Sequence, residues 1–232
     1  MKAFAITLDG NTISEAATEE LIRSSHHVGN DFVVIPFHAV RPADAENDLR
    51  AEGLTWTYPW AQPKIDLASG LTLSPYRTAD KRKRIGCFMS HYKLWQECEK
   101  LQEDILILEH DALFTNKLEY DIMNNNYGII GINDPRGATR KSMLYHTMIQ
   151  ESRYPVQSVP RIDNDMVPQG LAGNSAYIIK PWAATEVIKR IKQLGAWPND
   201  AMLCYQNFRA NFLGVTKKYY TKVQGTPSTT TL

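Results

Sequence analysis

The sequence predicts an α/β fold with a mostly parallel central sheet flanked by helices, and three observations lead to this class. A strand-like run, a helical segment and a second strand-like run follow one another within the first 36 residues. Such a βαβ pattern favours parallel strands joined by a right-handed crossover. A later run, Ile105–Leu108, is apolar without interruption, which is typical of a strand buried on both faces of a sheet. It stops at Glu109-His110-Asp111, and open α/β sheets bind their ligands at such carboxyl ends of strands.

The first βαβ unit follows from local patterns. The apolar run Ala3–Leu8 predicts a strand, and the turn residues at 9–11 end it. Residues 14–25 predict a helix, with Ser14 as the candidate N-cap. Residues 32–36 predict the second strand.

A long segment without clear periodicity, residues 41–83, separates this unit from the central helix. Such segments inside a domain are usually functional or mobile. Its aromatic side chains either stack on a sugar ring or hold the segment against the body by burying apolar area. They are Trp56, Tyr58, Trp60 and Tyr76. The basic run Lys81–Arg84 precedes the central helix and indicates either a solvated charged surface or cations that reach a diphosphate near the helix amino terminus.

The central helix is predicted from Ile85 onward by apolar residues at three- and four-residue spacing, with Ser90 as a plausible cap near its start. A polar turn at 102–104 leads into the buried strand. The remaining predicted elements are strands at 127–132 and 176–179, a helix at Pro181–Leu194 and a shorter helical segment at 201–212, whereas 138–169 looks irregular. We expect one domain over residues 1–224 and a loose C-terminal tail over 225–232.

Composition excludes several classes of protein. The 232 residues contain 43% hydrophobic residues, enough for a substantial core, and the net charge of +1 gives no field that would favour nucleic acid. Three widely spaced cysteines indicate reduced thiols. The sequence has neither a signal-peptide core nor an apolar run of membrane-spanning length, so we expect a cytoplasmic protein without a transmembrane segment.

The polar triplet Glu109-His110-Asp111 offers ligands of the kind that hard divalent cations take, although a hydrogen-bonded strand end is the plainer interpretation. The His-Asp pair does not fit a histidine–aspartate phosphohydrolase, whose ligands lie on helices. Neither GxxxxGK[ST] nor GxGxxG occurs, which argues against a P-loop kinase or a nicotinamide dehydrogenase. His91, on the central helix, is more often a hydrogen-bonded structural residue than a ligand.

Four segments together resemble glycosyltransferase family 25, the lipooligosaccharide and collagen galactosyltransferase group. The most specific begins with Ile85-Gly86-Cys87-Phe88-Met89-Ser90-His91 and ends with Ile107-Leu108-Glu109-His110-Asp111-Ala112; it is similar to the family's Gly-Cys-x-x-Ser-His and Leu-Glu-Asp-Asp-Ala motif. The others are Leu8-Asp9, Phe37-His38-Ala39-Val40, and Gly173–Ile179 with the downstream Asp200.

The resemblance implies a GT-A-like nucleotide-sugar-binding fold and transfer of galactose or glucose from a UDP-sugar to a hydroxyl of a glycan or another acceptor. It also implies an inverting mechanism and a divalent cation, Mn²⁺ or Mg²⁺. Asp111 would be the metal ligand, with Glu109 and His110 assisting or contacting the ribose. The residues implied to contact the donor are Thr7, Leu8, Asp9, Arg84, Ser90 and Glu109. Asp200 would be the base, in competition with Asp163 and Asp165, and the alternative role for Asp200 is a helix cap.

Departures from the family pattern leave alternatives open. Thr7 and Gly10 replace the usual Asn and Arg near the first strand, and His110 replaces the middle aspartate of the acidic triplet. One carboxylate fewer implies weaker or altered metal dependence, or a catalytically silent relative that binds a nucleotide or glycan. An unrelated metal-dependent phosphohydrolase is the third hypothesis.

Overall fold

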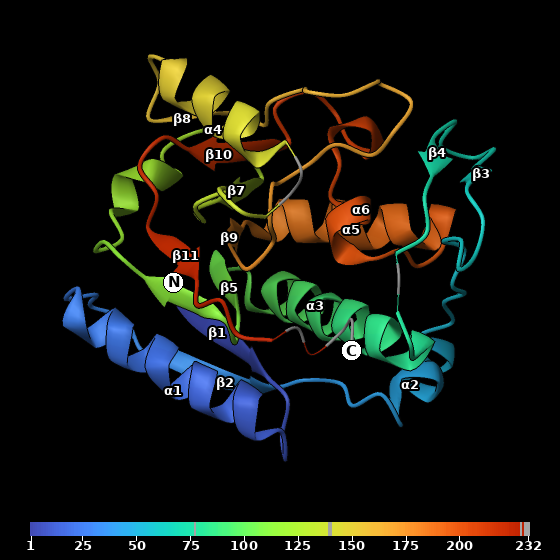
Figure 1. Cartoon of the computed structure of the whole chain (residues 1–232), viewed down its shortest axis with the longest axis horizontal. Coiled ribbons are helices and arrows are strands. Elements are labelled where there is room, and N and C mark those ends of the chain that lie inside the picture. Colours follow the sequence, from blue (N-terminus) through green and yellow to red (C-terminus); the bar gives the residue numbers. More distant parts are fainter. Residues whose placement is uncertain (77, 139–140, 228, 230–232) are drawn as a thin grey trace.

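The computed structural model describes residues 1–76, 78–138, 141–227 and 229 (Figure 1). The helices are α1 (Thr12–His27), α2 (Ala45–Ala51), α3 (Lys81–Leu101), α4 (Ser142–Glu151), α5 (Pro181–Leu194) and α6 (Asn199–Met202), with 3-10 turns at Tyr120–Met123 and Tyr205–Asn207. The strands are β1 (Lys2–Thr7), β2 (Val34–His38), β3 (Lys64–Ile65), β4 (Thr72–Leu73), β5 (Ile105–Glu109), β6 (Ala112–Phe114), β7 (Ile129–Gly131), β8 (Val156–Ser158), β9 (Ala176–Ile179), β10 (Leu213–Thr216) and β11 (Thr221–Val223).

Within the described residues, seven strands form the central sheet in the order β2-β1-β5-β9-β7-β10-β8. The pairs β1–β2, β1–β5 and β7–β10 are parallel, whereas β9 and β8 run antiparallel to their neighbours. Five strands therefore point the same way. The predicted α/β class with a mostly parallel sheet is confirmed, as is the parallel pairing of the first βαβ unit.

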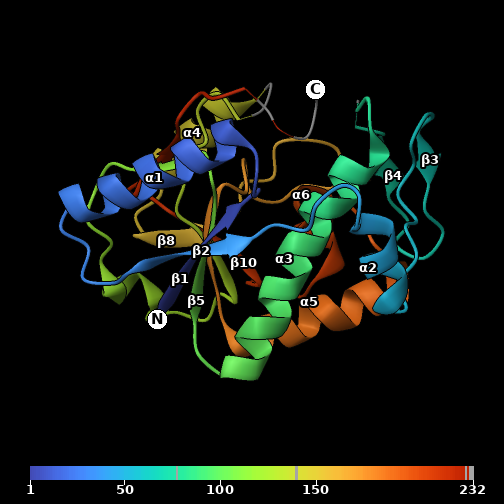
Figure 2. The same ribbon diagram turned by 90° about the horizontal axis from the view of Figure 1, so that it is seen from below.

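The sheet is buried on both faces, as the uninterrupted apolar runs predict. In β5, Ile105 and Ile107 join one apolar cluster and Leu106 and Leu108 join the other, because successive side chains of a strand point to opposite faces. Helices α3 and α5 pack against each other over the first cluster, and α1 covers the second. Figure 2 shows α1 on one side of the sheet and α3 with α5 on the other.

Several strand ends meet at one edge of this sheet. Glu109 at the end of β5 is in register with Ile6, so the chain that leaves β1 lies beside it. Thr7 is in register with His38 at the end of β2. Because β9 is antiparallel, its beginning, Ala176, lies at this same edge opposite Leu108. The polar residues that follow β1 and β5 and those that precede β9 are thereby brought together.

Two predicted helix starts are wrong. The N-cap of α1 is Asn11, whose side chain accepts the backbone N–H of Ser14. The N-cap of α3 is Asp80, whose carboxylate accepts the backbone N–H of Arg82. Ser90 therefore lies in the middle of α3, and the basic run 81–84 forms the first turn of that helix instead of preceding it.

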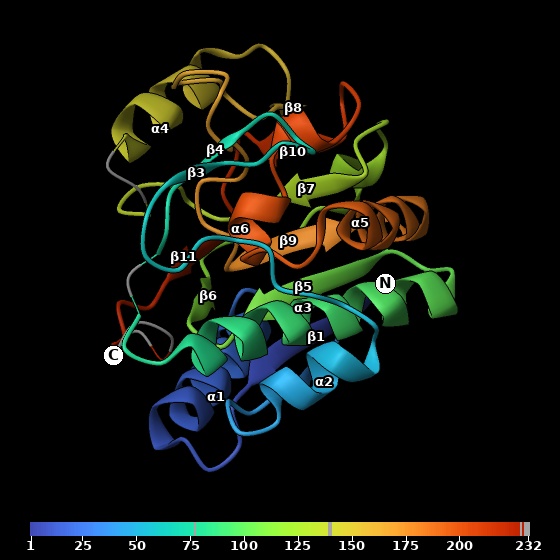
Figure 3. The ribbon, with the colours of Figure 1, turned by 90° about the vertical axis from the view of Figure 1, so that its right-hand side faces the viewer.

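The segments predicted to be irregular contain further elements. Helix α2 and the short strands β3 and β4 lie within 41–83, and α2 packs beside α3 (Figure 3). Helix α4 and strand β8 lie within 138–169, of which residues 139–140 are outside the described residues. The second strand begins at Val34, two residues later than predicted. The predicted helical segment 201–212 is only partly helical, and the strands β10 and β11 that follow it were not predicted.

The C-terminal part of the chain returns to the ligand edge of the sheet. Strand β11 pairs antiparallel with β6, which follows the acidic turn, and Figure 3 shows the chain beyond β11 running toward the amino end of α3. Residues 228 and 230–232 of the predicted loose tail lie outside the described residues. The three cysteines are free thiols. Among the described helices, none combines the length and apolar character that crossing a lipid bilayer requires.

Candidate active site

A cavity of about 340 Å³ opens at the edge where these strand ends meet, and we call it the strand-end cavity. Its walls come from the loops after β1, β2 and β5, from the first turns of α3, from the segment before β9 and from the start of α6. The polar side chains that line it are Lys83, Arg84, Cys87, Ser90, His91, Glu109, His110, Asp111, Asn174, Asn199, Asp200, Thr226 and Thr229.

The acidic turn between β5 and β6 places two carboxylates at the cavity. Glu109 is the last residue of β5, and Asp111 follows in the turn. Burial raises the pKa of Asp111 to about 7, and the negative charge of Glu109 adds to this shift. Burial raises the pKa of Glu109, but the hydrogen bond with His91 and the charge of Arg84 are among the interactions that lower it overall. Burial lowers the pKa of His110, which favours the neutral imidazole.

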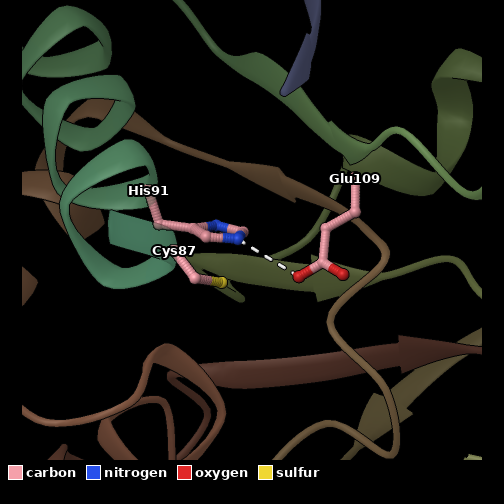
Figure 4. A group of neighbouring side chains, drawn as sticks. All are labelled: Cys87, His91 and Glu109. Atoms are coloured by element: carbon pink, nitrogen blue, oxygen red, sulfur yellow. Dashed lines mark hydrogen bonds and ion pairs between the residues drawn. The ribbon is translucent and has the colours of Figure 1, made fainter. Parts of the chain in front are cut away.

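A buried hydrogen-bond chain holds Glu109. The Trp95 indole donates to the hydroxyl of Tyr177 at 2.9 Å, and that hydroxyl lies 2.8 Å from Nδ1 of His91. Nε2 of His91 lies 3.3 Å from Oε1 of Glu109 (Figure 4). Since the indole can only donate, the Tyr177 hydroxyl is free to donate to Nδ1, which leaves the proton of His91 on Nε2, directed at Glu109. His91 is thus a hydrogen-bonded structural residue, as its position on a helix suggests.

The side chains of Cys87, His91 and Glu109 also form a group that could hold a metal ion, with ligand atoms within 4.8 Å of one another. Figure 4 shows Cys87 and His91 projecting from α3 toward Glu109. Burial raises the pKa of the Cys87 thiol far above its usual value, whereas metal binding needs the thiolate. The hydrogen-bond chain assigns the Nε2 proton of His91 to Glu109, so this group is better suited to orienting Glu109 than to binding a cation.

Asp200 lies at the start of α6 and faces the strand-end cavity. Burial raises the pKa of the Asp200 carboxyl, and the negative charge of Glu109 adds to this shift. The charge of Arg84 and a hydrogen bond with Tyr76 oppose it. Asp200 is not the N-cap of α6, which is Pro198, although its Oδ1 accepts the backbone N–H of Ala201 at 3.1 Å. The structure therefore places Asp200 in the cavity and not at the predicted cap position.

Small residues on α3 give the cavity its shape. A Cβ on Gly86 would lie 2.6 Å from the backbone oxygen of Val40, so only glycine permits this approach of α3 to the loop after β2. Ser90 stabilises the same contact between α3 and the loop after β2. Its hydroxyl accepts the backbone N–H of Val40 at 2.9 Å and donates to the Gly86 carbonyl at 2.7 Å. The Gly-Cys-x-x-Ser-His pattern is thus explained by close packing beside the cavity.

Some buried polar atoms at the cavity have no hydrogen-bond partner within the described part of the chain. They include Oδ1 of Asp111 and both amide atoms of Asn174. A buried polar atom without a partner is costly, so these atoms are suited to a polar partner that enters the cavity. A carboxylate oxygen suits a cation, and an amide suits a polar ligand that donates and accepts.

The structure separates the residues predicted to form the site into two groups. Leu8, Arg84, Ser90, Glu109, His110, Asp111 and Asp200 line the strand-end cavity. The others point elsewhere: Oγ1 of Thr7 bonds Thr18 of α1 at 2.9 Å, and Asp9 pairs with His38 at the surface. Asp163 pairs with Lys141, and Asp165 accepts a hydrogen bond from Tyr205. Neither of the last two aspartates is among the residues described as lining the cavity.

The profile of glycosyltransferase family 25 (LPS biosynthesis protein) matches residues 33–203 of this sequence. The chain belongs to glycosyltransferase family 25. Membership confirms the resemblance drawn from the motifs, and the sheet confirms the predicted α/β class. The residues matched include the Gly86–His91 motif, the acidic turn and Asp200, so the strand-end cavity of this glycosyltransferase is built largely from the part that defines the family.

Three solved structures show partial similarity to this chain. The galactosyltransferase LgtC, in complex with donor and acceptor sugar analogues, is 9% identical, with 92% of this chain and 72% of that chain covered and a TM-score of 0.45. Mouse xyloside xylosyltransferase 1, in its apo form, is 10% identical, with 88% and 80% covered and a TM-score of 0.40. The bifunctional glycosyltransferase WbbM is 10% identical, with 93% and 38% covered and a TM-score of 0.43. No curated protein sequence matches this chain.

Sequence reasoning missed several residues of the site. Asn174 stands in the segment Gly173–Ile179 that carried the resemblance, and its position before β9 could have identified it. Trp95 and Tyr177 were predicted only as parts of the central helix and of the strand at 176–179, and nothing local shows that they meet His91. Thr226 and Gln224 lie in or beside a segment interpreted as a loose tail, where no local pattern signals a contact with the acidic turn.

Proposed function

We propose that this glycosyltransferase transfers a hexose, galactose or glucose, from a UDP-sugar to a hydroxyl of a glycan acceptor, with inversion and with a divalent cation, within one domain of residues 1–224. The main support for the proposal is that Oδ1 of Asp111, which has no hydrogen-bond partner within the described residues, lies in the same cavity as Arg84 and Asp200. Such a transfer needs a carboxylate that holds the metal ion, a positively charged side chain near the diphosphate, and a second carboxylate that accepts a proton.

The acidic turn fits a divalent cation. Asp111 and Glu109 offer carboxylate oxygens, which hard cations prefer, and His110 beside them is favoured in its neutral, metal-competent form. A cation would offset the burial that raises the pKa of Asp111. Mn²⁺ or Mg²⁺ held there would act as a Lewis acid that stabilises the departing diphosphate.

The first turn of α3 suits the donor's phosphates. Lys83 and Arg84 line the cavity at the amino end of this 21-residue helix, where the partial positive charge of the helix also favours anions. The guanidinium of Arg84 lies 5.3 Å from the centre of the Tyr76 ring, which limits its freedom. Leu8, which follows β1, also lines the cavity.

Asp200 is the base in this proposal. Its raised pKa improves it as a proton acceptor, since a base works best when its pKa approaches the working pH. Asp200 removes the proton of the acceptor hydroxyl as that oxygen bonds to the anomeric carbon. The bond from the anomeric carbon to the diphosphate oxygen breaks on the opposite face, which inverts the configuration.

Incubation with a panel of UDP-sugars tests the proposal. We expect UDP-galactose or UDP-glucose to be consumed when Mn²⁺ is present and to survive when the cation is removed by a chelator, as measured by mass spectrometry. Stabilisation by UDP and Mn²⁺ without turnover of any donor would instead support a silent binding relative. Release of phosphate from UDP itself would support a phosphohydrolase.

Metal affinity should depend on pH through Asp111. Because burial raises the pKa of this carboxyl to about 7, a proton competes with the cation below that pH. Affinity for Mn²⁺ should therefore fall roughly tenfold per pH unit below pH 7 and level off above it. Titration with Mn²⁺ between about pH 5.5 and 8.5 measures this, and an affinity that does not change over the range would contradict it.

A further inference from the structure

The C-terminal part of the chain holds the acidic turn through one side chain. The Nε2 atom of Gln224 lies 2.8 Å from the carbonyl oxygen of Ala17 in α1, 3.0 Å from that of Ala112 and 3.3 Å from that of His110. Its backbone N–H donates to the Asp111 carbonyl at 2.7 Å. Gln224 therefore contacts the peptide groups of three consecutive residues of the turn and ties them to α1.

The chemistry of these contacts fixes the orientation of the amide. Each atom near Nε2 is a carbonyl oxygen, which can only accept, so the amide nitrogen and not the oxygen must face them. An amide nitrogen carries two hydrogens, so the two shorter contacts are full hydrogen bonds and the contact with His110 shares one of them. No other natural side chain of this length donates two hydrogens without adding a charge.

The hydrogen bonds of Gln224 to the acidic turn constrain the backbone on both sides of Asp111. The carbonyl groups of His110 and Ala112 flank this residue in the turn, so fixing both limits the rotation of the backbone that aims its carboxylate. Within the described residues, Oδ1 of Asp111 has no hydrogen-bond partner, so no contact of its own fixes that oxygen. Its direction depends on the backbone that Gln224 holds.

We propose that Gln224 is a positioning residue that sets the affinity of the acidic turn for the divalent cation. The inference rests on the proposed function, because it presumes the cation at Asp111. It assigns a role in the site to the C-terminal segment, which the family profile, matching residues 33–203, does not reach. The chain beyond Gln224 then enters the strand-end cavity at Thr226, so the same contact also guides that segment.

Replacement of Gln224 by methionine tests the proposal, because methionine has a similar length but no donor and no charge. Its backbone N–H to Asp111 and the β11–β6 pairing remain, so the fold should persist. We expect the dissociation constant for Mn²⁺, measured without donor by electron paramagnetic resonance, to rise roughly tenfold, as for other residues that orient metal ligands. Turnover at saturating Mn²⁺ should change little. In the metal-free protein, hydrogen exchange of the amides in 110–112 should become faster.

Gln206 provides the matched control. Its amide also donates to two backbone carbonyls, those of Asp165 and Val167, away from the cavity, so Gln206→Met should leave Mn²⁺ affinity unchanged. Gln224→Asn, whose amide is one methylene too short, is a milder second variant that should weaken binding in the same direction. Unchanged Mn²⁺ affinity in Gln224→Met, with normal binding by the unaltered chain, would overturn the role of Gln224. Absence of Mn²⁺ binding by the unaltered chain would overturn the proposed metal dependence itself.

Discussion

Replacement of Asp111 by asparagine should remove metal-dependent glycosyl transfer while leaving the protein folded. Asparagine keeps the shape of the side chain but loses the negative charge that we propose holds the cation. Lewis-acid stabilisation of a leaving group supplies several kcal/mol, and each 1.4 kcal/mol is worth about tenfold in rate, so kcat/KM should fall roughly 10²–10⁴-fold. Consumption of the UDP-sugar at saturating Mn²⁺ measures the loss. Because burial already disfavours the charge of Asp111, the variant should unfold at the same or a higher temperature at pH 8.

Asp104 provides the control for this experiment. It lies just before the amino end of the same strand, β5, and burial raises the pKa of its carboxyl as well, but it does not line the strand-end cavity as described. Asp104→Asn should therefore keep full activity and show that loss of a half-buried carboxylate near β5 is not by itself harmful. Full turnover in Asp111→Asn would remove the metal assignment.

The fold was predictable where the sequence is periodic over a sufficient length. The buried strand at 105–108, the strand at 176–179 and the helix at Pro181–Leu194 occur almost as predicted, because each has a strong apolar pattern and clear ends. Helix α2 and strands β10 and β11 were missed since they span between three and seven residues. Elements so short depend on packing with distant parts of the chain, and local patterns do not reveal them.

The site was predictable only in part, for a related reason. Glu109 and Asp111 follow an uninterrupted apolar run, so their place at a strand end could be deduced from neighbours in the sequence. Contacts between distant segments could not: the Trp95–Tyr177 hydrogen bond spans 82 residues, and the bond from Gln224 to the Ala112 carbonyl spans 112. Local reading likewise placed Ser90 at a helix start, whereas the structure uses its hydroxyl to join α3 to the loop at Val40.

The choice among three candidate bases should be decided by Asp200→Asn. In the proposed mechanism Asp200 receives the acceptor proton, and general bases contribute roughly 10²–10⁴-fold to a rate. We expect kcat to fall by that factor, whereas Mn²⁺ affinity and the KM for the donor remain close to those of the unaltered protein, because neither depends on this proton. Burial raises the pKa of the Asp200 carboxyl. The activity of the unaltered protein should therefore decline as the pH falls through that raised pKa, because a protonated Asp200 cannot accept the proton.

Asp163→Asn and Asp165→Asn complete the comparison. Both aspartates engage side chains outside the cavity, Lys141 and Tyr205 respectively, so each variant should retain most of its activity. Loss of kcat in Asp163→Asn or Asp165→Asn, with activity kept in Asp200→Asn, would move the base to the loop at 163–169 and would require that loop to approach the cavity during the reaction. Loss in Asp200→Asn alone is the result that the geometry predicts, because among the three only Asp200 shares the cavity with Asp111 and Arg84.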